Sequence, residues 1–316
     1  MSDPVDVRNL LDPEIAAILA QFPIDLSILS AETLPIVREM MGAMPAPPLS
    51  DQVELADYEI PGRPGASLRV YRPKGQSQPL PCLYWMHGGG LIMGTNTMDD
   101  ARFDRWCNLF PCVGVSVEYT LAPESAYPGP LEDCYEGLRW VHDNAASIGV
   151  DTSRVGIGGA SAGGGLAASL ALLARDRAEF AVAFQLLLYP MIDDRQITTS
   201  SGWSDPVWAP TANRFGWDSY LGELSGDDVP FYAAAARAED LSGLPSTLVC
   251  VGALDGFSDE DVAYATRLRH AGVPVELHVY PGAPHGFDAL AAGTTVAKRA
   301  TADMESWLAA VLVQAP

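Results

Sequence analysis

Positive charge is scarce in this 316-residue sequence, and lysine is nearly absent. Only 19 side chains are basic, Lys74 and Lys298 being the two lysines, whereas 40 are acidic, so the formal net charge is −21. Such an excess of negative charge repels nucleic-acid phosphates and anionic lipid headgroups. We therefore expect no nucleic-acid partner and no docking on a membrane through charge.

A targeting segment and a long apolar run are also missing. The stretch from Met1 to Asp6 is acidic and lacks the basic and apolar regions of a secretory signal. The longest uncharged run, from Val155 to Ala174, contains six glycines, which favours a strand, a turn and a helix over a membrane span. We predict a cytoplasmic protein without a membrane span.

Cysteine is sparse, and the five residues form no CxxC pair. An odd number without such spacing predicts buried free thiols in a reducing compartment. No group of histidines, cysteines and carboxylates has the spacing of metal ligands, so no metal and no cofactor is expected. The cysteines are Cys82, Cys107, Cys112, Cys134 and Cys250.

Apolar residues make up 48% of the chain, enough for a sizeable core, and they fall into short runs that alternate with helical patterns. Alternating strands and helices predict an α/β fold with a mostly parallel sheet and right-handed crossovers. The predicted strands are Ser67–Tyr71, Cys82–Met86, Val113–Glu118, Arg154–Gly158, Ala183–Tyr189, Thr247–Val251 and Val275–Tyr280, and the predicted helices are Leu131–Asn144, Leu166–Arg177, Asp259–His270 and one with an apolar stripe from Met304 to Leu312.

Two segments depart from this alternation. The first fifty residues carry short apolar clusters broken by prolines, which predicts two or three short helices. Residues 195–235 are rich in aromatic side chains and have little strand pattern. A stretch this long between two strands is typically a functional insertion, so the two segments together predict a lid. The alternative is that the aromatics are simply the core of a helical subdomain.

The strongest chemical signal is Gly159-Ala160-Ser161-Ala162-Gly163, which follows a predicted strand and precedes a predicted helix. A serine on such a strand-to-helix turn is held in a strained conformation that exposes its hydroxyl at the carboxyl end of the sheet. Flanking glycines are needed because a Cβ there would collide with the neighbouring strand and helix. The pattern by itself is common, and its position between strand and helix indicates a nucleophile.

A second signal is His87-Gly88-Gly89-Gly90, directly after the strand Cys82–Met86. Acyl transfer develops negative charge on an oxygen, and backbone N–H groups of a glycine-rich loop can stabilise it. A phosphate-binding turn is the alternative, but no Gly-Lys-Ser/Thr follows. We interpret His87 as a structural histidine that orients this loop.

A serine nucleophile needs a general base, and histidine is the usual one. His285 lies in a loop just after a strand, where active sites of α/β proteins form, and is the best candidate. His142 and His270 are expected on solvated helix faces, and His278 lies within a strand.

The base needs a carboxylate that orients it. Asp255 follows the strand Thr247–Val251, and Asp259 and Glu260 are its rivals. These two open a helix, where acidic side chains favour the helix dipole, so we interpret them as capping residues. The chain order Ser161, Asp255, His285 is that of α/β-hydrolases.

Together these motifs resemble the hormone-sensitive-lipase-like (family IV) carboxylesterases of the α/β-hydrolase fold. The resemblance covers the chain from about residue 50 to its end. The matching motifs are His87–Gly90, Tyr119–Glu124, Pro128 with Asp133, Gly159–Gly164, Asp255 with Asp259-Glu260, and His285–Phe287. The sequence departs from the family pattern at Ala160, at Thr120 and at Gly256-Phe257, none of which removes a catalytic atom.

The resemblance implies an eight-stranded sheet and a helical cap. Residues 1–50 and the insertion 195–235 would form the cap, and residues 51–194 and 236–316 the catalytic domain. It also implies Ser161 as nucleophile, His285 as base and Asp255 as its partner. The implied oxyanion donors are the backbone N–H groups of Gly89, Gly90 and Ala162, with Gly88 and His87 supporting their loop.

The expected activity is hydrolysis of a small-molecule carboxylic ester with a short- to medium-length acyl chain. Two alternatives use the same fold: a non-catalytic receptor for a small ligand, and an amide hydrolase with the same triad. Receptors of this kind typically lose a member of the triad, and all three are present here. Members of the family often form dimers, so a homodimer stays open.

Overall fold

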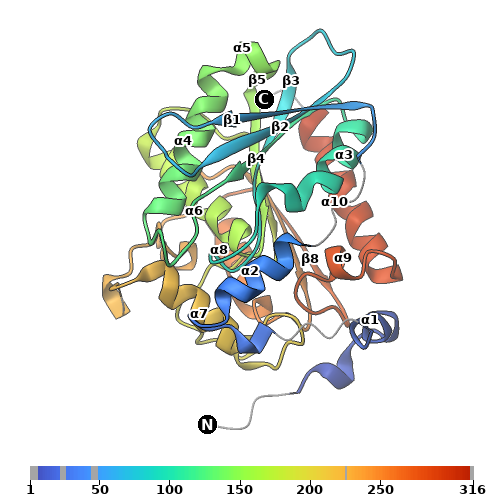
Figure 1. Cartoon of the computed structure of the whole chain (residues 1–316), viewed down its shortest axis with the longest axis vertical. Helices are drawn as coiled ribbons and strands as arrows, with labels where there is room; N and C mark the ends of the chain where they lie inside the picture. The colour runs from blue at the N-terminus through green and yellow to red at the C-terminus, as the bar shows by residue number, and fades with distance from the viewer. Residues whose placement is uncertain (1–5, 22–25, 44–48, 225, 314–316) are drawn as a thin grey trace.

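Eight strands form one sheet in the order β1-β2-β4-β3-β5-β6-β7-β8. Strand β2 pairs antiparallel with both β1 and β4, and all the other pairs are parallel. The computed structural model describes residues 6–21, 26–43, 49–224 and 226–313 (Figure 1). The strands are β1 (Val53–Glu59), β2 (Ser67–Pro73), β3 (Leu80–Met86), β4 (Val113–Glu118), β5 (Val150–Ala160), β6 (Phe184–Leu188), β7 (Ser246–Gly252) and β8 (Val275–Tyr280).

Helices cover both faces of the sheet (Figure 1). Helices α4, α6 and α8 contribute to the core on one face, and α1, α3, α9 and α10 to the core on the other. The helices are α1 (Pro13–Leu19), α2 (Leu34–Gly42), α3 (Asp100–Leu109), α4 (Gly129–Asp143), α5 (Ala145–Ile148), α6 (Ala162–Arg177), α7 (Pro210–Leu221), α8 (Ser258–His270), α9 (Phe287–Leu290) and α10 (Thr295–Val313).

Strand β3 shows why the central strands read as continuous apolar runs. All seven of its residues are buried. Successive side chains of a strand point to opposite faces, and here Tyr84 and Met86 enter one core while Leu83 and Trp85 enter the other. A strand buried on both faces has no polar side to alternate with.

The predicted α/β-hydrolase fold, with a mostly parallel eight-stranded sheet flanked by helices, is confirmed. All seven strands predicted from the residues are present, and the stripe of the last helix is buried at Met304, Trp307, Leu308 and Leu312. The residue pattern alone missed β1, because six of its seven residues are exposed. It also ended β5 at Gly158, whereas the strand runs to Ala160.

The two segments outside the alternation contain helices and no strand among their described residues. The N-terminal segment holds α1, α2 and the short 3-10 helices η1 (Arg8–Leu10) and η2 (Leu26–Ile28). The insertion holds α7 with η4 (Ser200–Gly202) and η5 (Gly226–Asp228), and η6 (Ala235–Arg237) follows at its end. Helix α7 packs against η2, so the two segments touch.

All five cysteines are buried and free, as predicted. Burial raises the pKa of Cys134, and likewise of Cys82 and Cys250, which disfavours the reactive thiolate. Over the described residues, no helix is both long and apolar enough to cross a membrane.

Candidate active site

Ser161 occupies the sharp turn between β5 and α6. Its φ of 57° and ψ of −120° form a strained backbone conformation for a residue with a side chain. The Ser161 N–H donates to the Leu188 carbonyl oxygen at 2.9 Å, which ties the turn to β6. A Cβ at Gly163 would overlap the Met86 carbonyl oxygen, so only glycine lets α6 approach β3 this closely.

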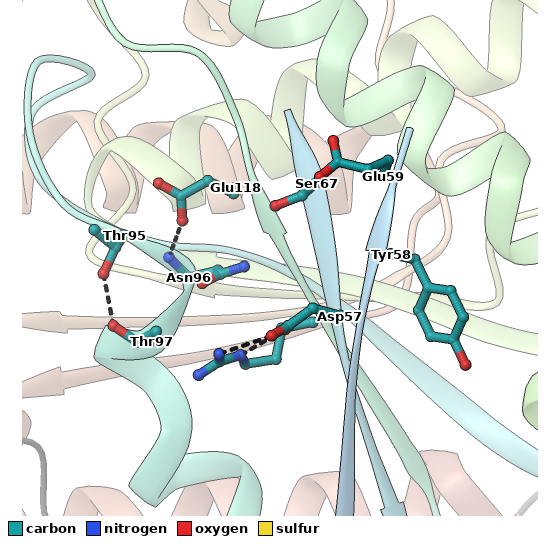
Figure 2. A pocket seen from close by; sticks show the side chains of 9 residues that line it. Asp57, Tyr58, Glu59, Ser67, Thr95, Asn96, Thr97 and Glu118 are labelled. Carbon is teal, nitrogen blue, oxygen red and sulfur yellow. Dashed lines mark hydrogen bonds and ion pairs between the residues drawn. The ribbon is translucent and has the colours of Figure 1, made fainter. Parts of the chain in front are cut away.

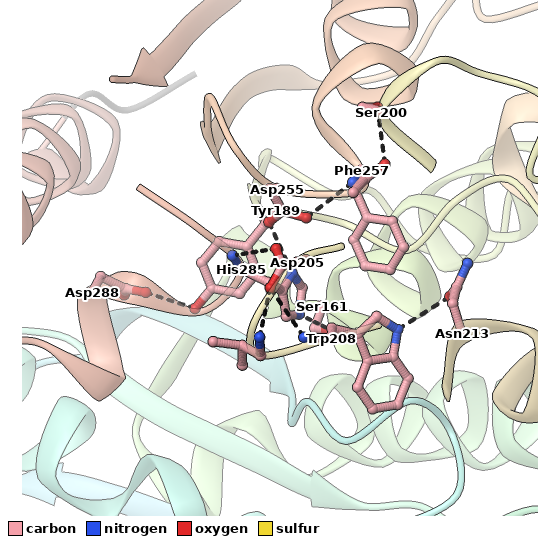
Figure 3. A network of polar contacts seen from close by, with 12 residues as sticks. Ser161, Tyr189, Ser200, Asp205, Trp208, Asn213, Asp255, Phe257, His285 and Asp288 are labelled. Atoms are coloured by element: carbon pink, nitrogen blue, oxygen red, sulfur yellow. Dashed lines mark hydrogen bonds and ion pairs between the residues drawn. The ribbon is translucent and has the colours of Figure 1, made fainter. Parts of the chain in front are cut away.

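His285 lies between Ser161 and Asp255 (Figure 3). Its Nε2 is 2.8 Å from the Ser161 Oγ, and its Nδ1 is 2.8 Å from the Asp255 Oδ2. The carboxylate accepts from Nδ1–H, which leaves Nε2 free to accept the serine proton. Asp255 is held in turn by the Phe257 N–H, which donates to its Oδ1 at 2.9 Å. The structure therefore brings together three side chains that are distant in the sequence.

The charge around His285 makes it a stronger base than a free imidazole. Burial, the largest single effect, favours the neutral ring, but the negative charges of Asp255, Asp205 and Asp288 outweigh it, so the pKa of His285 lies above its ordinary value of 6.5. These carboxylates favour the imidazolium that forms when the ring takes a proton.

The glycine loop after β3 packs directly against the serine turn. A Cβ at Gly88 would be 3.1 Å from the Ala160 carbonyl oxygen and 3.6 Å from the Ser161 Cβ. Gly90 has a φ of +60°, and the Trp208 ring lies so close that a side chain at Gly90 would overlap it. Ala162, the third implied donor, is the first residue of α6, where backbone N–H groups lack partners within the helix.

His87 makes its own contacts within the glycine loop and with Tyr119. Its Nδ1 donates to the Gly88 carbonyl oxygen at 2.8 Å, and its ring stacks on Tyr119 with centroids 4.1 Å apart. The Tyr119 hydroxyl donates to the His87 carbonyl oxygen at 2.8 Å. Burial lowers the pKa of His87 to about 4, so the ring is neutral near pH 7. These contacts brace the glycine loop.

A cavity of about 530 Å³ opens onto Ser161 and His285. Besides the glycine loop, it is lined by α3, α9 and α10, and by residues of the two segments outside the alternation. Leu26 and Met41 come from the N-terminal segment, and Val207 and Trp208 from the insertion. Ser161 and His285 thus face a largely apolar chamber to which both segments contribute.

Several residues around His285 were missed at the level of sequence. Tyr189 lies edge-on to the His285 ring at 4.9 Å and Phe257 at 5.1 Å. Asp205, from the insertion, accepts from the His285 backbone N–H at 2.9 Å. No short-range sequence pattern predicts the contact of Asp205 with His285, because the two residues are 80 positions apart in the chain.

The rival carboxylates do not cap α8, which corrects the interpretation from sequence. Asp259 accepts from the Ser200 backbone N–H at 2.9 Å. Glu260 is buried and accepts from the N–H groups of Ile192 and Asp193, just beyond β6. Both side chains therefore hold residues at or just before the start of the insertion. The first turn of α8 is capped instead by the Ser200 hydroxyl, whose Oγ accepts from the Asp259 N–H at 3.0 Å.

The remaining histidines lie away from Ser161. His270 is exposed, as predicted. The prediction for His142 was wrong, because its ring is half-buried and stacks on Phe180 with centroids 4.8 Å apart. His278 on β8 is 2.7 Å from the Glu276 carboxylate.

A second hollow of about 410 Å³ lies at the β1 edge of the sheet (Figure 2). Asp57, Glu59 and Glu118 line it, but Asp57 pairs with Arg69 at 2.9 Å and Glu118 accepts from the Asn96 N–H at 2.6 Å. No histidine lines it to activate a hydroxyl. Across the described ranges of the chain, no three His, Cys, Asp or Glu side chains are grouped to hold a metal ion.

Comparison with known proteins agrees with the fold and with an esterase activity. A family model described as the α/β-hydrolase fold matches residues 83–289. Esterase LipI of Mycobacterium tuberculosis is 31% identical over 306 residues, covering 95% of both chains. Carboxylesterase NlhH of the same species is 33% identical, over 95% of this chain and 96% of the relative.

Solved structures lead to the same family. A bacterial heroin esterase superposes with a TM-score of 0.89 at 39% identity, covering 98% of this chain and all of the other. Esterase LipW from Mycobacterium marinum superposes with a TM-score of 0.85 at 34% identity over 99% of both chains. These relatives confirm the expectation of an esterase. The chain belongs to the α/β-hydrolase fold family and, within it, to the hormone-sensitive-lipase-like carboxylesterases.

Proposed function

We propose that this carboxylesterase works through Ser161, His285 and Asp255. The observation that carries the proposal is the unbroken chain of two 2.8 Å contacts from the Ser161 hydroxyl through the His285 ring to the Asp255 carboxylate. It opens into a cavity lined by Gly89 and Gly90. A hydroxyl, a base and backbone donors around one cavity are the requirements of acyl transfer.

In the first half-reaction, Ser161 Oγ attacks the ester carbonyl carbon while His285 Nε2 takes its proton. The negative oxygen of the tetrahedral intermediate is stabilised by the N–H groups of Gly89, Gly90 and Ala162. Asp255 stabilises the imidazolium. The imidazolium then protonates the leaving alkoxide, the C–O bond breaks, and the acyl group stays on Ser161.

In the second half-reaction, water gives its proton to His285 Nε2 and attacks the acyl carbon. The tetrahedral intermediate collapses, Ser161 Oγ regains its proton from the imidazolium, and the carboxylic acid leaves. No step draws on a cofactor or a metal. The same residues carry both halves, because His285 acts alternately as base and acid.

We propose a preference for acyl chains shorter than about ten carbons, since only an apolar chamber of limited size is available for the chain. The cavity holds about 530 Å³ for the acyl and alcohol parts together, and Trp208 closes it over Gly90. An optimum at long acyl chains would contradict this preference.

We further propose that residues 1–50 and 195–235 act together as a cap over the site. The packing of η2 on α7 supports this proposal. Leu26 and Trp208, one from each segment, line the cavity. The alternative, in which the aromatics serve only as core, holds in part, since Trp217 and Tyr220 are buried within the cap.

The decisive experiment is hydrolysis of p-nitrophenyl esters from acetate to palmitate, with Ser161→Ala beside the wild type. We expect turnover of short esters that disappears in the variant, and matching p-nitroanilides test the amide-hydrolase alternative. A folded wild type that binds esters without hydrolysing any would contradict the proposal and favour a receptor. Homodimer formation and a cytoplasmic location stay predictions.

A further inference from the structure

The cap insertion places a second carboxylate against the catalytic histidine (Figure 3). Asp205 is 4% exposed, and its Oδ2 accepts from the His285 backbone N–H at 2.9 Å. Asp255 holds the ring of the same residue from the other side. The base is therefore held by two buried acids, one on its ring and one on its main chain.

The other oxygen of Asp205 organises the cap itself. Its Oδ1 accepts from the Val207 N–H at 2.7 Å and from the Trp208 N–H at 3.1 Å. Trp208 lies over Gly90 of the oxyanion loop. A single carboxylate thus connects the backbone of His285 with Trp208, which lines the cavity.

We infer that Asp205 is a positioning residue of the esterase reaction, which sets the place of His285 relative to Ser161 and joins the cap to the base. This inference rests on the proposed function of the triad. The physical reason is that three backbone donors converge on one buried anion, and hydrogen bonds to a charged group are stronger than neutral ones. A misplacement of the base by about 1 Å can cost about 100-fold in rate.

The charge of Asp205 also acts on the ring. The ionisable groups that face His285 are Asp255 after β7, Asp205 in the insertion, Asp288 at the start of α9 and Tyr189 after β6. Asp288 also forms an ion pair with Arg102 and accepts a hydrogen bond from the Tyr189 hydroxyl. Burial and the charge of Asp255 raise the pKa of Asp205 to about 6, so Asp205 is ionised above that pH and favours the imidazolium.

The test replaces Asp205 with Asn and measures short-chain p-nitrophenyl esters across pH. The carboxamide oxygen can still accept from Val207 and Trp208, but its NH2 group then faces the His285 N–H and cannot accept from it. We expect kcat to fall about 10- to 100-fold with KM changed less than about threefold. The acid limb of kcat/KM should move to lower pH, because one negative charge has left the base.

The matched control is Asp194→Asn. Asp194 pairs with Arg237 at 2.6 and 2.8 Å and joins the two ends of the insertion, away from the triad. If Asp205 had a merely structural role, kcat would fall by a similar factor in both variants, and the acid limb of kcat/KM would not move. Either result would overturn the inference. Unchanged kcat in Asp205→Asn would overturn it as well.

Two safeguards keep the outcomes distinct. First, thermal unfolding of each variant shows whether it is folded. Second, Asp205→Ser replaces the Asn variant if that variant is unstable, since one hydroxyl can still accept from the Val207 and Trp208 N–H groups but cannot also reach His285. Its expected changes in kcat and pH profile are the same. A wild type without any esterase activity would refute the proposed function, whereas an active wild type matched by the Asp205 variants refutes only this inference.

Discussion

In the proposed mechanism, single side chains decide how Ser161 is activated. His285 is held through Nδ1, its backbone N–H and the aromatic rings of Tyr189 and Phe257. Such constraints keep the ring pointed at the hydroxyl and lower the cost of ordering it during the reaction. The surrounding carboxylates raise the pKa of His285, so in the proposed mechanism they set the pH range in which it acts as a base.

The first prediction concerns the pH dependence of kcat/KM. Because the pKa of His285 lies above 6.5, the ring is protonated and inactive at low pH, and activity rises as the pH passes through that pKa. We expect an acid limb with a midpoint above 6.5 in a profile from about pH 5 to about pH 9. The spontaneous hydrolysis rate at each pH is the control, and a midpoint clearly below 6.5 would show that burial outweighs the carboxylates.

The second prediction concerns the size of the acyl site. Trp208→Ala removes the ring that lies over Gly90, so longer acyl chains should fit. We expect the kcat/KM ratio of octanoate to butyrate p-nitrophenyl esters to rise about tenfold or more. Trp203→Ala is the matched control, since Trp203 lies in the same insertion but outside the cavity lining. An equal ratio in wild type and Trp208→Ala would locate the acyl chain elsewhere.

At the scale of elements, the site depends on where β5 and α6 meet the neighbouring strand. Helix α6 begins directly after Ser161 and is buried from Ala162 to Ala174. Its glycines allow α6 to approach β3 closely. The sequence predicted a later start of this helix, at Leu166, whereas α6 begins at Ala162. Helix α8 differs from α6, because two of its buried side chains, Glu260 and Asp261, are acidic.

The third prediction tests the approach of α6 to β3. Gly163→Ala places a methyl group on the Met86 carbonyl oxygen, which is backbone and cannot turn aside. We expect a loss of about 1–3 kcal/mol in unfolding free energy and a loss of esterase activity. Gly202→Ala is the control, because nothing lies within 4 Å of the added methyl. Urea unfolding of both variants measures the difference, and equal stabilities would contradict the overlap.

The fourth prediction concerns Asp261 on α8. It is fully buried, and neither carboxylate oxygen has a partner among the described residues. Burial and the nearby Glu260 and Asp255 raise its pKa well above 3.8. Since the folded state favours the protonated form, this contribution to stability is complete below pH 3.8 and is lost as the pH rises through the folded-state pKa.

Asp261→Asn should therefore stabilise the protein at pH 8 and change it little at pH 4. Each unit by which the folded-state pKa exceeds its ordinary value corresponds to about 1.4 kcal/mol. Thermal unfolding at both pH values measures the effect. Exposed Asp259 on the same turn provides the control variant Asp259→Asn, and a loss of stability in Asp261→Asn at pH 8 would refute the argument.

At the scale of the whole molecule, the net charge of −21 is the dominant feature. Many arginines pair with carboxylates on the surface, as Arg177 does with Glu132 and Arg105 with Glu305. Exposed pairs of this kind contribute about 0–1 kcal/mol each, so they do not cancel the mutual repulsion of the excess acids.

The fifth prediction follows from this repulsion. Raising sodium chloride from about 0.01 M to about 0.15 M shortens the screening length from about 30 Å to about 8 Å. We expect the melting temperature at pH 8 to rise by several degrees. The same titration near the pI of about 4.4 is the control, where little net charge is left to screen. A melting temperature that falls with salt at pH 8 would mean that ion pairs outweigh repulsion.

Most of the elements and the local motifs could be predicted from the residues alone. Continuous apolar runs predict buried strands such as Cys82–Met86, and the glycines around Ser161 predict its sharp turn. Both signals are local, because they depend on residues that are neighbours in the chain. The order of Ser161, Asp255 and His285 likewise followed from residues that come just after strands. The exposed strand β1 was not predicted, since a strand without a buried face carries no apolar pattern.

Which distant groups meet depends on how the whole chain packs. Asp205 and His285 are 80 residues apart, and Trp208 reaches Gly90 from another segment, so no local pattern encodes either contact. The same holds for Glu260, which suits a helix cap by its position but binds the N–H groups of Ile192 and Asp193 in the folded chain. Burial makes these contacts strong, and burial exists only once the elements have packed.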